Sequence, residues 1–277
     1  MFTHFDIHRH LKLTALAVAM AATAALAPAQ VGLGLTPMRE DLKLAPGTQH
    51  SGVLTLTNDA AAKVRVAGEL LDFHIDATGT PQFGRQPAEA DFSCRQWLTL
   101  NPVDLELNAS EHVPVRYTVR VPPAATERSF HCAIGFTTQP TASQAGGTGL
   151  RTAVQIVAAI YVVVGSPALE GSVKDLKLEY LPDPKKPGWQ AVVVIGNPGL
   201  MHFRPAGALD VLDESGTVVE SIQFTPLPVL PKRDQNFLFP LRLAGGPGKY
   251  TLRARVDLGG NEIQEATAAV VATRPVP

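Results

Sequence analysis

The stretch AVQIVAAIYVVVG, residues 153–165, constrains the fold most, because a strand formed by it is apolar on both faces. Successive side chains of a strand point to opposite faces. One face carries Ile156, Ala158, Ile160, Val162 and Val164. The other carries Gln155, Val157, Ala159, Tyr161 and Val163. One of these faces can enter the core of the chain itself, and the second face then needs another partner.

Two kinds of partner are compatible with the second face. A long apolar strand at a sheet edge can receive a strand from another protein. Alternatively, both faces are buried within the chain, for instance against a second domain. Residues 139–152, QPTASQAGGTGLRT, are small, polar and rich in glycine, and they predict a loop directly before this strand. Such a loop would give a partner access to the strand, although most loops of this composition only connect.

The rest of the chain has almost no helical periodicity and consists of short alternating runs bounded by Gly, Pro, Asn and Asp. This pattern predicts an all-β fold. We expect strands at 32–36, 40–44, 51–57, 63–75, 97–100, 103–107, 112–121, 130–138 and 153–165. A second series is expected at 169–180, 188–196, 206–213, 217–224, 234–243, 248–257 and 262–272.

Residues 1–29 have the features of a secretory signal peptide. Arg9 and Lys12 precede an apolar run at 13–26, and Ala27-Pro28-Ala29 supplies the small residues that a signal peptidase needs, so we expect cleavage before Gln30. The alternative is a retained membrane anchor, which the apolar run disfavours because it is short for a membrane span. These features predict an exported protein of the periplasm or cell envelope, without membrane insertion after cleavage.

The mature chain of about 248 residues is long for one domain and indicates two. The formal net charge is −1 for the whole chain and −2 without the signal, which contains Arg9, Lys12 and Asp6. No basic block is present, so a nucleic-acid partner is not expected. The two cysteines, Cys94 and Cys132, most simply form one disulfide in an oxidising compartment; two buried thiols or a redox pair are the alternatives.

Enzyme motifs are missing from the sequence, including the nucleophile elbow, H-E-x-x-H and the phosphate-binding loop. His74 and Asp76 share a strand face, but no third ligand with suitable spacing accompanies them. We therefore expect no catalytic residue, no metal and no cofactor, and a protein that binds rather than catalyses.

The order of segments in residues 31–165 resembles the amino-terminal domain of periplasmic pilus-assembly chaperones, which are immunoglobulin-like sandwiches. The resemblance is carried by VGLGLTPMREDLKLAPGTQHSGVLTLTN, by RQWLTLNPVDLELNASEHVPVRYTVRVP, and by HCAIGFTT followed by AVQIVAAIYVVVG. It implies that the last strand lends apolar side chains to an incomplete pilus subunit. The strand-edge residues that it marks as partner-binding are Ile156, Val157, Ala158, Ala159, Ile160, Tyr161, Val162 and Val163.

The resemblance also implies a cleft in which an arginine of the first strand and a lysine of the last strand hold the terminal carboxylate of the subunit. Arg39 matches that arginine approximately, and a solvated arginine beside Glu40 and Asp41 is the alternative. Tyr161 stands where the lysine is expected, so the chain departs from the family at this position. Tyrosine carries no charge at neutral pH. Tyr161 faces either the partner or a domain interface.

The second half resembles other exported bacterial immunoglobulin-like modules in Asn197-Pro198-Gly199, in residues 202–207, in PVLP at 228–231 and in residues 248–260. Arg204 either binds an anionic group or braces a loop by pairing with a carboxylate. We place the domain boundary at Gly165-Ser166-Pro167, which gives domains at 30–165 and 166–277 and a short, fixed elbow.

The sequence thus predicts an all-β chain of two immunoglobulin-like sandwiches in tandem. The first functional hypothesis is a non-enzymatic periplasmic chaperone of pilus or fimbria assembly that binds β-rich, pilin-like subunits by strand addition along 153–165. A structural or adhesive module of the cell envelope, with this strand inside its own fold, is the alternative. A carbohydrate-binding sandwich is a third, which the low aromatic content of 6% disfavours.

Overall fold

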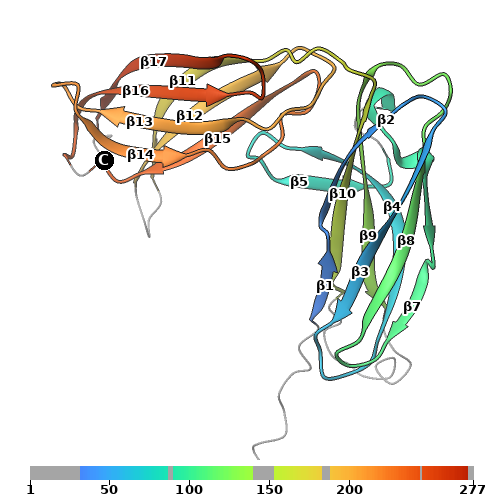
Figure 1. Ribbon diagram of the computed structural model, residues 1–277. Helices are drawn as coiled ribbons and strands as arrows, with labels where there is room; N and C mark the ends of the chain where they lie inside the picture. Colours follow the sequence, from blue (N-terminus) through green and yellow to red (C-terminus); the bar gives the residue numbers. More distant parts are fainter. Residues whose placement is uncertain (1–31, 87–89, 140–152, 183–187, 244, 274–277) are drawn as a thin grey trace, which may run out of the picture.

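The chain folds into two β-sandwiches, which Figure 1 shows as the two arms of an L-shaped molecule. The computed structural model describes residues 32–273 apart from 87–89, 140–152, 183–187 and 244, so the predicted signal peptide and most of the predicted loop lie outside the described residues. The prediction of an all-β chain with two sandwiches in tandem is confirmed. The helical elements of the described part are two 3-10 turns, η1 (Ala90–Phe92) and η2 (Arg95–Trp97).

The first sandwich is formed by the strands that precede residue 165. One sheet has the order β1 (Leu33–Thr36), β3 (Gln49–Asn58), β8 (His112–Arg120), β6 (Leu98–Asn101). The facing sheet has the order β2 (Arg39–Leu44), β10 (Gln155–Val164), β9 (Arg128–Gln139), β4 (Val64–Ile75), β5 (Pro81–Gly84), and β7 (Asp104–Leu107) also pairs with β4. The chain thus changes sheets between β1 and β2.

The second sandwich has the same two-layer plan. Its smaller sheet has the order β11 (Ser172–Leu181), β12 (Gly188–Asn197), β15 (Arg233–Leu241). Its larger sheet has the order β14 (Val218–Gln223), β13 (Ala206–Leu212), β16 (Gly248–Asp257), β17 (Ile263–Ala272). The predicted domain boundary falls between β10 and β11. At this point Gly165 has a φ of 72°, a conformation that favours glycine.

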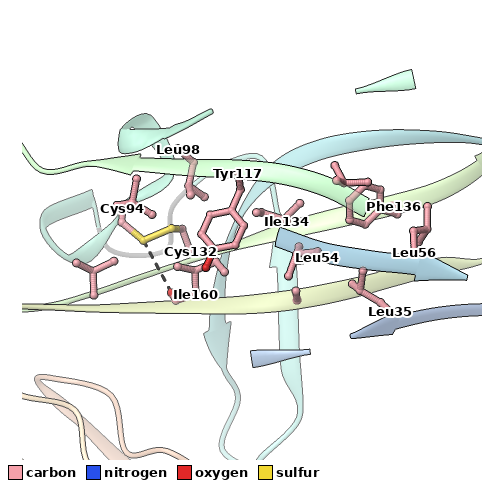
Figure 2. Packing of buried hydrophobic residues seen from close by; sticks show 14 of the residues in the cluster. Leu35, Leu54, Leu56, Cys94, Leu98, Tyr117, Cys132, Ile134, Phe136 and Ile160 are labelled. Atoms are coloured by element: carbon pink, nitrogen blue, oxygen red, sulfur yellow. Dashed lines mark hydrogen bonds between the residues drawn. A yellow bond between two sulfur atoms is a disulfide. The ribbon is translucent and has the colours of Figure 1, made fainter. Parts of the chain in front are cut away.

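The core of the first sandwich is made by the inward-facing residues of both sheets, and Figure 2 shows Leu54, Ile134 and Phe136 meeting across it. Each large side chain that is fully buried here contributes about 1.5–3 kcal/mol relative to exposure. Cys94 and Cys132 form a disulfide within this core, with a Cα–Cα distance of 5.3 Å. The alternative of two free thiols is therefore wrong. The disulfide ties the turn between η1 and η2 to the middle of β9.

The two apolar faces of β10 are buried in different places. Ala158, Ile160, Val162 and Val164 belong to the core of the first sandwich, and Ile156 packs against it. Tyr161 belongs to a separate cluster with Phe73, Ile75 and Leu230, against which Val157 and Ala159 pack. Leu230 lies in the second sandwich, before β15. The middle of the second face is therefore covered by the second sandwich, which was one of the two partners that the sequence allowed.

Candidate partner-binding site

The strand β10 is paired on both sides along only part of its length. On one side β9 pairs with it from Gln155 to Val164. On the other side β2 runs parallel to it and pairs from Ala159 to Val164. Within the described ranges, no strand pairs with Gln155–Ala158 on that second side. Among the described residues, this short segment is therefore an open sheet edge, because the chain upstream of Arg39 leaves for the opposite sheet.

The open edge ends at a defined hydrogen bond. The Ala159 N–H donates to the Met38 carbonyl at 3.0 Å, so odd-numbered residues of β10 direct their backbone groups to the β2 side. Hydrogen bonding alternates between the two sides of a strand in an antiparallel sheet. The Val157 N–H therefore points to the open side. Ile156 and Val157 are half-buried, which leaves part of both apolar side chains exposed at this edge.

The predicted partner-binding residues separate into two groups. Ile156, Val157 and Ala158 lie on the open segment, whereas the edge of the segment 159–163 is already paired with β2. An added strand would reach the first group directly and would have to displace β2 to reach the second. Partner binding by any of these residues stays a prediction.

Tyr161 lies at the junction of the two sandwiches. The residue is 4% exposed, and its ring contacts Phe73 edge-on, with 5.6 Å between ring centroids. From the second sandwich, the His202 ring lies at 4.8 Å and the Arg204 guanidinium carbon at 4.5 Å from the Tyr161 ring centroid. Burial raises the pKa of Tyr161, so its hydroxyl stays neutral at physiological pH. Of the two positions that the sequence left open, Tyr161 occupies the domain interface.

The carboxylate of Asp41 lies close to three basic side chains at the same junction. Its carboxylate lies 3.0 Å from Arg39 Nε and 3.1 Å from Arg204 Nη1. His202 Nε2 is 3.7 Å away. Hydrogen bonding from His202, followed by the charges of Arg204 and Arg39, holds the pKa of Asp41 below its usual range, against the opposing effect of burial. The prediction that Arg204 pairs with a carboxylate is confirmed, and the partner is on the other sandwich.

Arg39 uses part of its hydrogen-bonding capacity within the protein. Its side chain is 52% exposed and pairs through Nε with Asp41. Arg39 is opposite Ala159 in the β2–β10 register, and Asp41 is opposite Tyr161, so both charged side chains share the face that looks toward the second sandwich. Arg39 and Arg204 give this junction two positive charges against the one carboxylate of Asp41.

Further hydrogen bonds join the sandwiches around this cluster. The Ser129 N–H donates to the Leu200 carbonyl at 2.8 Å, and the His202 N–H donates to Ser129 Oγ at 2.9 Å. Away from the cluster, Gln235 Nε2 donates to the Asp76 carbonyl at 3.2 Å, where the β4–β5 hairpin meets the second sandwich. Sequence reasoning did not single out Ser129, and it named Asp41 only as a neighbour of Arg39, because neither residue stands in a recognisable motif.

His131 is buried beside this interface. Burial lowers the pKa of His131 to about 4, and the neighbouring His202 adds to this effect. The His131 ring packs edge-on against Phe73, with 5.1 Å between ring centroids, and its Nδ1 is buried without a hydrogen-bond partner in the described structure. The imidazole of His131 is therefore neutral in the folded state at neutral pH.

A cavity of about 460 Å³ lies at the elbow, next to the charged cluster. Asp41, Lys43 and Arg204 line it together with apolar side chains that include Val163, Met201 and Phe203. Across the described ranges, no group of three or more His, Cys, Asp or Glu residues could hold a metal ion, and no helix is long and apolar enough to cross a membrane.

No family model matches the chain, and no curated protein matches it. Among solved structures, the chain is similar to the class 5 fimbriae chaperone CfaA, with 14% identity and a TM-score of 0.44 over 88% of this chain and 100% of that one. It is similar to the Escherichia coli chaperone DraB, with 17% identity and a TM-score of 0.41 over 85% and 98% of the two chains.

A third similar structure is the CsuC–CsuE complex, a chaperone with a tip adhesion subunit from the Csu pili of Acinetobacter baumannii. It has 12% identity and a TM-score of 0.43 over 85% of this chain and 97% of that one.

Proposed function

We propose that this protein is an exported, non-enzymatic chaperone of pilus or fimbria assembly that binds pilin-like subunits by strand addition. The observation that carries the proposal is the open edge at Gln155–Ala158, which ends in a donor–acceptor pair with Met38. Unpaired strand edges with apolar side chains are the sites at which extended segments add to a sheet. A client strand placed there would continue the line of β2 along β10.

The charged cluster supports a second contact with the same client. Arg39 is exposed near the junction of β2 with β10, one strand position after the open edge ends. A guanidinium binds a carboxylate through charge-assisted hydrogen bonds. We propose that Arg39 anchors the terminal carboxylate of the client, and that Arg204 supplies the second positive charge, which the neutral Tyr161 does not provide.

A structural role in the cell envelope is favoured by a different observation. Residues 159–164 of β10 are paired on both sides, and Tyr161 is covered by the second sandwich. Most of the apolar strand is therefore satisfied inside the protein. In this second candidate function, the open segment would be an ordinary strand end without a client.

Co-purification from the periplasm distinguishes these functions when the backbone edge alone is altered. Val157→Pro removes the N–H that points to the open side and leaves the residues that bond to β9 unchanged. Val157→Thr is the matched control, since it keeps the β-branched shape and the N–H. We expect a small β-rich protein to co-purify with the native chain and with Val157→Thr, and to be lost from a folded Val157→Pro variant.

Recovery of the same partner with Val157→Pro would show that strand addition at this edge is wrong. Recovery of no partner with any of the three proteins, when a secreted β-rich subunit is expressed together with them, would favour the structural module. Thermal unfolding of each variant shows whether a lost partner reflects a lost fold.

A further inference from the structure

Asp41 holds two arginines that come from different parts of the chain. Arg39 belongs to the same strand as Asp41, whereas Arg204 lies 163 residues away, before β13. Each arginine uses a different oxygen of the Asp41 carboxylate, Oδ2 for Arg39 and Oδ1 for Arg204. Two guanidinium groups that converge on one carboxylate form a site for a carboxylate, and in this structure Asp41 fills it from within.

The hydrogen bonding of the Arg204 nitrogens limits where another carboxylate can bind. Its Nε and Nη2 are buried and have no hydrogen-bond partner in the described structure, while Nη1 donates to Asp41 at 3.1 Å. Nη1 is thus the Arg204 nitrogen that already holds a carboxylate, and an external carboxylate that binds there competes with Asp41. Arg39 is more open, because its contact with Asp41 uses Nε and its side chain is 52% exposed.

Space for a small carboxylate exists beside this cluster. The elbow cavity is lined by both Asp41 and Arg204, and Lys43 adds another positive charge at its wall. The Asp41 side chain is 42% exposed, so it can turn away from the arginines into solvent. A carboxylate that enters would meet positive charge from both sandwiches, but also the negative charge of Asp41, which repels it.

We propose that Asp41 is an internal competitor that occupies the carboxylate site of Arg39 and Arg204 until a partner's carboxylate replaces it. This inference rests on the proposed function only for the identity of the natural ligand, which would be the terminal carboxylate of a client. Asp41 sets the affinity of the site, and displacement of Asp41 also breaks its link to the second sandwich. Arg204 thereby couples carboxylate binding to the contact between the sandwiches.

Acetate is a suitable probe, because it carries a carboxylate and cannot add to a strand edge. We would titrate acetate into the mature protein and follow the Nε–Hε signals of Arg39 and Arg204 by NMR. Asp41→Asn should lower the dissociation constant for acetate about tenfold, because the competing charge is gone. Asp41→Asn with Arg204→Gln should lose most of this gain. Asp234→Asn is the matched control, since Asp234 forms an exposed pair with Lys174 away from the elbow.

A second measurement needs no substitution at Asp41. In the wild-type protein, saturating acetate should shift the Asp41 carboxyl carbon signal and the Arg204 signal together. A shift of Arg39 alone, or equal acetate affinities for wild type and a folded Asp41→Asn variant, would overturn the inference. Val157→Pro should leave the acetate titration unchanged. Failure of the acetate test would therefore not affect strand addition, and loss of the co-purified partner would not affect the acetate result.

Discussion

The two sandwiches share the same short-range hydrogen-bond networks and differ in the residues that they contribute to their junction. Asn58 ends β3 and Asn197 ends β12, and each side chain donates to a carbonyl four residues later at 2.8 Å, in Ala62 and Met201 respectively. Each also accepts from the N–H two residues later, at 3.1 Å and 3.0 Å. Both asparagines are buried. The same short-range network therefore shapes the loop after the corresponding strand in each sandwich.

The hairpins that follow are also alike. Asp76 Oδ1 accepts from the N–H groups of Thr78 and Thr80, and Asp213 Oδ1 accepts from those of Ser215 and Thr217. Such aspartate turns satisfy the backbone without distant partners. What differs is long-range: the first sandwich has the disulfide, the open edge and Asp41, and the second contributes His202 and Arg204. The local hydrogen-bond networks are therefore common to both sandwiches. Apart from the disulfide, which lies in the core of the first sandwich, the differences are found at the open edge and at the junction.

Removal of the disulfide should have the largest effect on the difference in stability between the two sandwiches, since only the first sandwich has one. Cys94→Ala with Cys132→Ala should lower the free energy of unfolding of the first sandwich by about 3–4 kcal/mol, from the closed loop of 38 residues. Trp97 packs in the first sandwich and Trp189 in the second, so each reports on one of them. Urea unfolding of single-tryptophan variants checks this. An equal loss at Trp189 would mean that the sandwiches unfold as one unit.

Replacement of the two buried asparagines tests whether their hydrogen-bond networks contribute equally to the free energy of unfolding of the two sandwiches. Asn58→Ala and Asn197→Ala should each cost about 2–3 kcal/mol, because several backbone groups lose their partners while buried. Each loss should be detected by the tryptophan of the same sandwich. Asn261→Ala, at an exposed position, is the control and should have almost no effect. A cost below 1 kcal/mol for either buried asparagine would contradict the equivalence of the two networks.

Acidification should give the smallest of these three losses of stability. The loss should come from His131, which is buried beside the interface of the two sandwiches. His131 has a folded pKa of about 4, below the unfolded value of about 6.5, so the unfolded state binds the proton more readily. Its contribution to stability is complete above pH 6.5 and is lost as the pH falls toward 4, with about 2 kcal/mol lost at pH 5. His131→Gln should remove this part of the pH dependence. The same slope between pH 7 and pH 5 in both proteins would show that His131 is not responsible.

Strand positions were predictable because they depend on local alternation. The run expected at 63–75 is β4, which spans Val64–Ile75, and the run expected at 153–165 is β10, which spans Gln155–Val164. The strand β5 was not predicted: Pro81–Gly84 is short, begins with proline and lacks an alternating apolar pattern. Its position comes from the Asp76 turn, which folds it back onto the end of β4.

The candidate site was only partly predictable. The apolar strand, Arg39 and the cysteine pair stand out in the sequence by residue type. The pairing of β2 with Ala159–Val164 does not, because a parallel register between distant segments has no local signal. The ion pair between Asp41 and Arg204 joins residues that lie 163 positions apart, and Asp41 looks like any charged residue of an exposed strand.

The all-β class, the positions of most strands and the two apolar faces of β10 can be derived from the amino-acid sequence, since these follow from the period of the side chains along a strand. Three features required the tertiary structure: what covers each face of β10, which four residues of β10 keep an open edge, and which carboxylate Arg204 binds. These features depend on how two sheets and two sandwiches meet. That meeting is specified by many weak contacts between distant residues and by no segment alone.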